Sequence, residues 1–299
     1  MKTHVAAGVA ALALLTLGAC GDQTDPGTVA DPGSSQVPGT PSSDVSSASS
    51  GIEHATGADD VVLRVFVGGG FVAADYAFTN QPSLLVTGDG RVFLPAADEG
   101  VDGQRLASLR VVQGDEDTIQ QVLALAQEHG LLSKPPSYED TSGPLISDAP
   151  TTSVLLNAAG GSFEHDAYAL SFGAGSPTEA EQGDRAELAA FIDEATALFA
   201  DTESSPYEPS RLRLRAEAFG GEPGNRSTVV AWPSVEPPVD LASVADSGCV
   251  AVPAEGLVDA LSSADFSTYF RQGGEVYTVS AAAVLPGEEP CSGSERGAF

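Results

Sequence analysis

Residues 151–199, TTSVLLNAAGGSFEHDAYALSFGAGSPTEAEQGDRAELAAFIDEATALF, decide the fold class. Apolar and polar side chains alternate over Thr151–Asn157 and Ser162–Tyr168, on either side of Ala158-Ala159-Gly160-Gly161, which predicts a β-hairpin. A helix is predicted over Glu179–Phe199, where apolar residues recur at helical spacing: Leu188, Phe191, Ile192, Ala195, Leu198 and Phe199. A hairpin followed by a helix is typical of an α+β fold in which helices pack on one face of an antiparallel sheet.

The same succession of elements occurs earlier in the chain. Val61–Val67 has the composition of a strand. Ser83–Thr87 and Arg91–Leu94 flank Gly88-Asp89-Gly90, and these turn residues tolerate the positive φ angles of a tight hairpin. The two segments therefore predict a further pair of antiparallel strands.

The clearest helix is Asp115–His129. Its apolar residues share one face: Ile119, Val122, Leu123 and Ala126. Asp115 or Asp117 can cap the first turn, and Gly130 follows as a stop signal. A protonated His129 in the last turn would meet the negative end of the helix dipole, so we expect it to cap the helix rather than to catalyse.

Residues 83–199 resemble a type of α+β domain of unknown function that is found in exported bacterial proteins. The resemblance rests on turn and packing motifs, namely Gly88-Asp89-Gly90, a helix that ends in Gly130-Leu131-Leu132, and Asp148–Thr152 before the second hairpin. It implies a fold and carries no activity.

A polar, proline-containing stretch, Asp201–Pro209, predicts a boundary between two consecutive small α+β domains, 59–205 and 206–299. The second of these contains three predicted strands and one short helix: Arg211–Ala216, Cys249–Val252, Val276–Leu285 and Ala254–Leu261.

Three arginines alternate with apolar residues in the first strand of the second domain: Arg211, Arg213 and Arg215. Alternation with period two predicts a half-buried strand whose outer face is basic. Because such a row is isolated in an acidic chain, it is our candidate partner surface. A strand face that is simply exposed to water is the alternative.

The first twenty residues have the pattern of a secretory signal. A basic start, Met1–His4, precedes the apolar run Val5–Leu15, and small residues lead to Cys20. The apolar run is shorter than the roughly 20 residues that a transmembrane helix needs.

Leu17-Gly18-Ala19-Cys20 resembles the lipobox of bacterial lipoproteins, and the preference for arginine over lysine resembles high-GC Gram-positive bacteria. The lipobox implies that residues 1–19 are cleaved as a signal peptide and that lipid on Cys20 anchors the chain on the outer face of the cell membrane. An ordinary secretory signal with an accidental cysteine is the alternative. Residues 20–58 contain few large apolar side chains, so we expect the lipidated cysteine to be followed by a disordered linker.

The chain contains three cysteines. With Cys20 assigned to lipid, Cys249 and Cys291 remain as an even pair in an oxidising compartment, which favours a disulfide. A free, catalytic cysteine is the alternative.

The charge of the chain excludes some partners. It has 13 Lys and Arg against 42 Asp and Glu, a formal net charge of −29. Because nucleic-acid binding depends on neutralising phosphates, we expect no nucleic-acid partner. The same charge keeps an exported protein soluble.

Motifs of catalysis and metal binding are absent from the sequence. It has no Gly-x-Ser-x-Gly, no His-Glu-x-x-His and no Cys-x-x-Cys, and only His129 and His165 lie in the predicted folded part. We expect His165 to occupy a packing or surface position. No catalytic residue, metal ligand or cofactor is therefore expected.

These observations favour a membrane-anchored, non-catalytic binding or assembly module of the cell envelope, whose partner would be an envelope protein or a cell-wall ligand. A carboxylate-dependent envelope hydrolase is the first alternative, and it requires two acids in a cleft with one raised pKa. A solute-capture lipoprotein is the second alternative, although the chain lacks the regular strand–helix alternation of that class.

Overall fold

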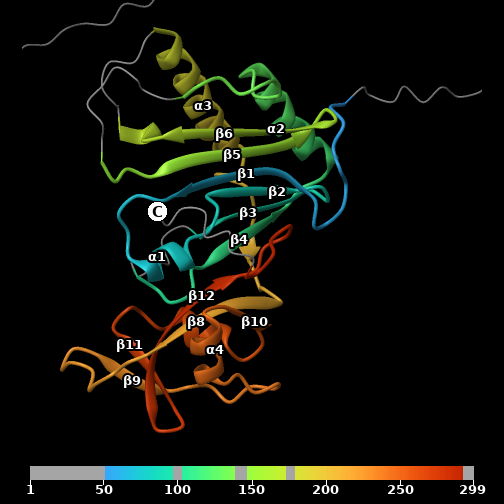
Figure 1. The fold of residues 1–299 in the computed structure, drawn as a ribbon. Helices are drawn as coiled ribbons and strands as arrows, with labels where there is room; N and C mark the ends of the chain where they lie inside the picture. The colour runs from blue at the N-terminus through green and yellow to red at the C-terminus, as the bar shows by residue number, and fades with distance from the viewer. Residues whose placement is uncertain (1–50, 97–102, 139–146, 173–178, 292–299) are drawn as a thin grey trace, which may run out of the picture. The chain divides into compact units, whose positions relative to one another are not determined.

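Two β-sheets form the framework of the computed structural model, which describes residues 51–96, 103–138, 147–172 and 179–291 (Figure 1). Both sheets belong to one compact unit, Ala48–Phe299. With the helices, they make an α+β fold and confirm the predicted fold class.

The first sheet has seven strands in the order β6-β5-β1-β2-β3-β4-β7, and all its neighbouring pairs are antiparallel. Its strands are β1 (Val61–Gly68), β2 (Leu84–Thr87), β3 (Arg91–Pro95), β4 (Leu109–Gln113), β5 (Thr151–Ala158), β6 (Gly161–Tyr168) and β7 (Ser205–Pro206). Both predicted hairpins, β2–β3 and β5–β6, are confirmed.

Two long helices, α2 (Glu116–Glu128) and α3 (Glu179–Ala197), cover one face of this sheet (Figure 1). The main core lies between them and the strands, and its largest side chains include Ile119 and Leu123 of α2 and Phe191 of α3. Asp115 caps α2, because its carboxylate accepts a hydrogen bond from the backbone N–H of Thr118 at 3.0 Å.

The second sheet has five strands in the order β10-β8-β12-β11-β9. Its strands are β8 (Arg211–Ala218), β9 (Thr228–Ala231), β10 (Val250–Pro253), β11 (Thr268–Gln272) and β12 (Glu275–Ala283). Only the β9–β11 pair in this sheet is parallel. Helix α4 (Leu241–Ser247) and the short α5 (Val258–Ser262) supply apolar residues to the core on one side of the sheet.

A small third core connects the two sheets. Leu85 and Phe93 of the first sheet pack with Ala283 and Leu285 at the end of β12. The short helix α1 (Ala74–Thr79), which the sequence analysis does not predict, also packs against β12. The two sheets therefore share buried apolar surface.

The folded unit begins before residue 59, where the sequence predicts it to start. The amide of Gln120 in α2 exchanges two hydrogen bonds with the backbone of Ile52, of 2.8 and 2.9 Å. The backbone N–H of Ala159 donates to the carbonyl of Glu53 at 2.7 Å. Residues 51–58 contain a single large apolar residue, Ile52, and these specific contacts with the helix and with a hairpin turn account for their order.

Candidate functional site

The three arginines of the predicted partner surface lie on one face of β8, as their alternation requires. The strand register places Arg215 opposite Ser280 of β12, and Val276 of β12 opposite Arg271 of β11. Ser280 and Val276 are four residues apart on β12 and so lie on the same face, which means that Arg271 projects from the same face of the sheet as Arg215. We call Arg211, Arg213, Arg215 and Arg271 the arginine face.

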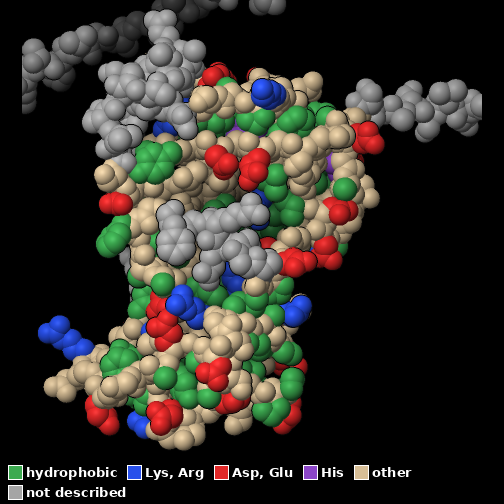
Figure 2. Space-filling view, in the orientation of Figure 1, with side chains coloured by type: hydrophobic (Ala, Val, Ile, Leu, Met, Phe, Trp, Pro, Cys, Tyr) green, Lys and Arg blue, Asp and Glu red, His purple; other side chains and the backbone are tan. Residues whose placement is uncertain are grey.

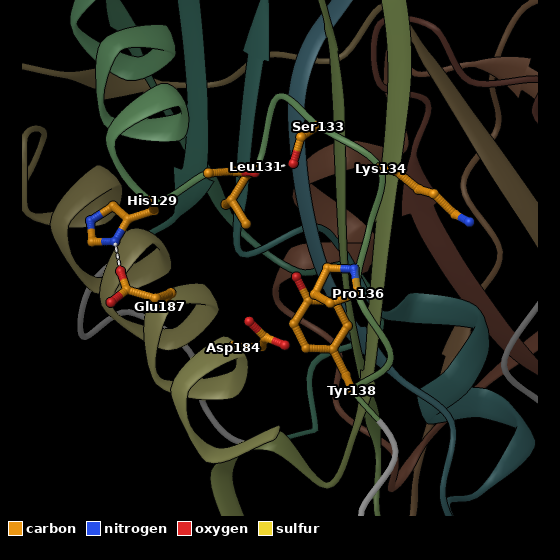
Figure 3. A pocket seen from close by; sticks show the side chains of 9 residues that line it. His129, Leu131, Ser133, Lys134, Pro136, Tyr138, Asp184 and Glu187 are labelled. Atoms are coloured by element: carbon orange, nitrogen blue, oxygen red, sulfur yellow. Dashed lines mark hydrogen bonds and ion pairs between the residues drawn. The ribbon is translucent and has the colours of Figure 1, made fainter. Parts of the chain in front are cut away.

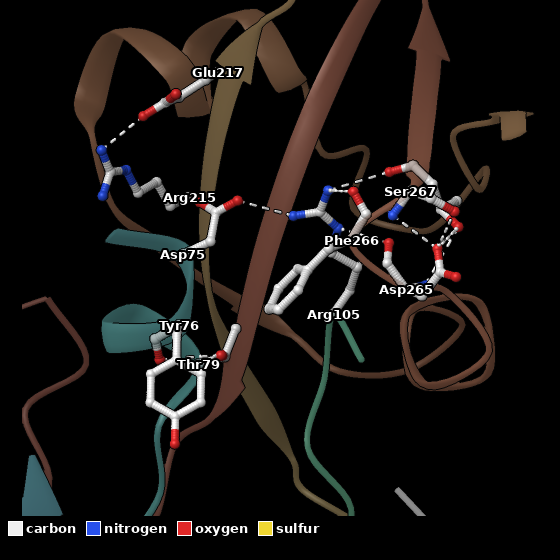
Figure 4. A network of polar contacts seen from close by, with 10 residues as sticks. Asp75, Tyr76, Thr79, Arg105, Arg215, Glu217, Asp265, Phe266 and Ser267 are labelled. Carbon is white, nitrogen blue, oxygen red and sulfur yellow. Dashed lines mark hydrogen bonds and ion pairs between the residues drawn. The ribbon is translucent and has the colours of Figure 1, made fainter. Parts of the chain in front are cut away.

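Two members of the arginine face are engaged within the protein. Arg213 donates from Nη2 to the carbonyl of Phe78 at 3.2 Å, and its guanidinium lies 5.5 Å from the centre of the Phe78 ring. It thereby holds the last turn of α1. Arg215 pairs with Glu217 two residues along the strand, with 2.6 Å between Nη2 and Oε1 (Figure 4).

The other two members, Arg211 and Arg271, are exposed. Within the described part of the chain neither guanidinium has an ion-pair partner. The arginine face therefore has two parts. The part around Arg213 is covered by α1, whereas Arg211 and Arg271 are open to a partner.

A fifth arginine, Arg105, is buried beside α1 with only 1 % of its side chain exposed. It donates to the carboxylate of Asp75 at 3.0 Å and to the backbone carbonyls of Asp265 and Phe266 at 3.0 and 3.1 Å (Figure 4). The guanidinium also lies 5.1 Å from the centre of the Phe266 ring. This residue joins α1 to the loop before β11.

That loop is ordered by Asp265. Its carboxylate accepts hydrogen bonds from the hydroxyls of Ser267 and Thr268 at 2.7 and 2.9 Å, and these bonds lower the pKa of Asp265. The carbonyls that receive Arg105 are thus fixed in place by a neighbouring side chain. Arg105 is a structural residue rather than a free cation.

A pocket of about 230 Å³ opens between the end of α2 and the side of α3 (Figure 3). Its polar lining includes His129, Lys134, Tyr138, Asp184 and Glu187.

His129 is the C-cap residue of α2, at the helix end where the sequence predicts it, and its ring lies against α3. Nδ1 lies 2.7 Å from Glu187 and Nε2 lies 3.5 Å from Glu194, both on α3. Desolvation lowers the pKa of His129, but these two carboxylates outweigh it, and the pKa is raised above its ordinary value. A protonated His129 therefore also meets two carboxylates of the neighbouring helix α3.

His165 lies behind the wall of this pocket and is fully buried. Its Nε2–H donates to the carbonyl of Leu131 at 2.9 Å, so Nδ1 accepts the hydroxyl proton of Tyr138 at 2.7 Å. Burial of the His165 ring lowers its pKa. Burial of the Tyr138 hydroxyl, together with the charge of Asp184, raises the pKa of Tyr138 to about 12. Both ring nitrogens are occupied, which fits the packing position that the sequence predicts.

Five carboxyl groups of the described residues have pKa values displaced in the direction opposite to the one that acid catalysis needs. Hydrogen bonds to the ionised form outweigh desolvation and lower the pKa of five described carboxyl groups: Asp89, Asp115, Glu116, Asp240 and Asp265. A general acid at neutral pH needs a raised pKa. These five groups therefore do not supply one.

Residues 51–96, 103–138, 147–172 and 179–291 contain no cluster of three His, Cys, Asp or Glu side chains arranged to hold a metal ion. None of the helices in these ranges is long and apolar enough to span a bilayer.

The predicted cysteine pair is brought together. The sulfur atoms of Cys249 and Cys291, which are 42 positions apart in the sequence, lie at bonding distance. Cys20 and the lipobox lie outside the described residues.

Strand β9 is a feature that the sequence analysis misses. It occupies an edge of the second sheet, and all four of its residues are exposed (Figure 1). Arg226 lies two residues before it, and Arg271 is paired in register with its last residue, Ala231. The β-branched run Thr228-Val229-Val230 was the available signal, but it is too short to predict a strand with period two.

No family model matches the chain, and neither the curated proteins nor the solved structures include a significant match to it. The contacts and charges described above are therefore the basis on which a function can be proposed.

Proposed function

We propose that this chain is a lipoprotein, held on the outer face of the cell membrane through lipid on Cys20, and that its folded unit is a non-catalytic binding or assembly module. The observation that carries the proposal is the lipobox-like Leu17-Gly18-Ala19-Cys20 directly after the apolar run Val5–Leu15. The linker that the sequence predicts after Cys20 lies outside the described residues up to position 50.

The binding role is supported by the contacts of the two histidines in the folded unit, His129 and His165. His129 is paired with Glu187 and Glu194, and His165 is enclosed by Tyr138 and Leu131. These contacts give both imidazoles a structural role, because they join helices and strands.

The partner contacts that we propose are the two open cations of the arginine face, Arg211 and Arg271, which lie at opposite ends of β12. Six arginines of the described residues are engaged with carboxylates or carbonyls: Arg91, Arg105, Arg110, Arg185, Arg213 and Arg215. Carboxylates are spread over the face of the molecule drawn in Figure 2, and an exposed cation without an ion-pair partner can attract an acidic group of a partner.

The anchoring is tested by metabolic labelling with an alkyne fatty acid in the bacterium that expresses the full-length chain. We expect label on the wild-type protein and none on Cys20→Ala, which should accumulate as an unprocessed precursor. Cys249→Ala is the matched control, because it removes a cysteine that we assign to a disulfide, and it should remain labelled. Label on Cys20→Ala equal to that on the wild type would show that lipid is not attached at this position.

A further inference from the structure

The open edge of β9 offers unpaired backbone groups. The N–H groups of Thr228 and Trp232 donate to carbonyls of Ser267 and Arg271 at 3.1 and 2.9 Å, so they face β11. Successive backbone N–H groups of a strand point to opposite sides. The N–H and C=O groups of Val229 and Ala231 therefore point away from the sheet, at an edge that no other described strand covers.

The other three edge strands carry features that discourage strand addition. Strand β7 is two residues long and contains Pro206, and β10 ends in Pro253. Strand β6 presents Glu164 and Asp166, both exposed.

Strand β9 reads TVVA and has no proline or charge within it. Its two valines project from opposite faces of the sheet and are 37 and 36 % exposed. β-branched side chains at an uncovered edge are the features that favour pairing with a further strand.

A cation lies at each end of this edge. Arg226 precedes β9 by two residues, and Arg271 lies on the neighbouring strand beside Ala231. Both side chains are exposed, and the described residues include no ion-pair partner for either. A strand added here would have an exposed arginine near each end, and a guanidinium complements the carboxylates of an acidic segment.

From this arrangement we infer that β9 is the docking edge for an extended, acidic segment of a partner polypeptide. The segment adds as a sixth strand to the second sheet, its backbone pairs with Val229 and Ala231, and its carboxylates meet Arg226 and Arg271. This inference rests on the proposed binding role and supplies the chemistry of the partner. It does not depend on the lipid anchor.

The test is selection from a random displayed peptide library on the purified mature chain carrying Cys20→Ala. We expect enriched peptides to combine alternating β-branched residues with Asp or Glu near their ends. Val229→Pro removes one outward N–H and leaves the bonds to β11 intact, so it should weaken binding about tenfold. The control Val229→Thr keeps that N–H and the β-branched shape, and its affinity should stay within about twofold of the wild type.

Surface charge provides a second measurement that does not depend on the proline variant folding. Arg226→Glu combined with Arg271→Glu should weaken the selected peptides about tenfold at low salt and by less at high salt. The assignment fails if no peptide is enriched. It also fails if the enriched peptides bind a well-folded Val229→Pro variant and the double Glu variant as tightly as they bind the wild type. It also fails if the purified chain sediments as a dimer that Val229→Pro dissociates, because the occupant would then be a second copy. The protein in these experiments carries no lipid, because Cys20 is replaced by Ala. A negative result would therefore count against the docking edge and not against the lipid anchor.

Discussion

At the residue scale, the two most deeply buried arginines that the structure describes, Arg105 and Arg185, are each held by several specific acceptors. Arg185 illustrates the pattern, because its guanidinium is buried and donates to the carbonyls of Tyr138, Tyr168 and Ala169 at 2.8, 3.1 and 2.8 Å. A buried cation without such bonds would cost several kcal/mol of desolvation. The sequence shows that an arginine is present, but only the tertiary structure shows which carbonyls converge on it.

His129 gives a pH-dependent prediction at the same scale. Its pKa is raised in the folded state, so the stabilisation that it provides is fully present below its unfolded pKa and is lost as the pH rises through the folded pKa. Because Glu187 and Glu194 are largely exposed, the effect should be about 0.5 kcal/mol. We expect His129→Gln to lower the free energy of unfolding relative to the wild type more at pH 5.5 than at pH 8.5, as measured by urea denaturation.

The control for this experiment changes the carboxylates instead of the imidazole. Glu187→Gln with Glu194→Gln should abolish most of the same pH dependence, because it removes the two carboxylates that the structure places 2.7 and 3.5 Å from the nitrogens of the His129 ring. A difference between His129→Gln and wild type that is the same at both pH values would show that the ring acts only through packing.

At the element scale, α2 shows how a local signal specifies a helix start. Asp115 accepts from the backbone N–H of Thr118, and the Thr118 hydroxyl accepts from the backbone N–H of Asp115 at 3.2 Å. Asp115→Ala removes this reciprocal cap and should lower the midpoint of thermal unfolding by about 2–4 °C. Asp117→Ala is the matched control in the same first turn, and its midpoint should move less because Asp117 does not cap the helix. Equal shifts for the two variants would mean that charge near the helix dipole, not the cap, is what stabilises the start.

Elements with strong local signals were predictable from the sequence, and those that depend on tertiary contacts were not. The prediction of Asp115–His129 is confirmed by α2, and the two glycine-containing turns are confirmed by the β2–β3 and β5–β6 hairpins. Helix α1 has six residues and no side-chain cap, so its sequence carries no start signal. It is held instead by Arg213 and by packing on β12.

At the scale of the whole molecule, the alternation around Arg211 predicted which residues share a face, but not what covers that face. Alternation fixes the side of a strand on which a side chain lies. It contains no information about α1, which lies more than 130 positions earlier in the chain and occupies Arg213. Arg271 joins the arginine face only because β11 pairs with β12 in the observed register. The open part of the candidate site could therefore not be predicted without the tertiary structure.

Arg105 allows the connection between the two sheets to be tested. It precedes the predicted boundary at Asp201–Pro209, yet it bonds to carbonyls of Asp265 and Phe266 beyond that boundary. Arg105→Met keeps the length of the side chain and leaves these carbonyls and the Asp75 carboxylate without their donor, which should cost about 3 kcal/mol of unfolding free energy. Arg211→Met, at an exposed position, should change it by less than about 0.5 kcal/mol.

The course of unfolding then distinguishes two roles for this contact. Because the sheets share the buried side chains of Phe93 and Leu285 as well as the bonds of Arg105, we expect the wild type to unfold in one cooperative transition. Arg105→Met weakens the connection itself and should separate the transitions followed by Trp232 fluorescence, which reports on the second sheet, and by far-ultraviolet circular dichroism, which reports on the whole chain. If the two probes of Arg105→Met instead change together, at a lower denaturant concentration than in the wild type, Arg105 adds stability to a single cooperative unit. The apolar contacts between the sheets would then suffice to couple them. Two separate transitions already in the wild type would show that the shared core is too small to couple the sheets.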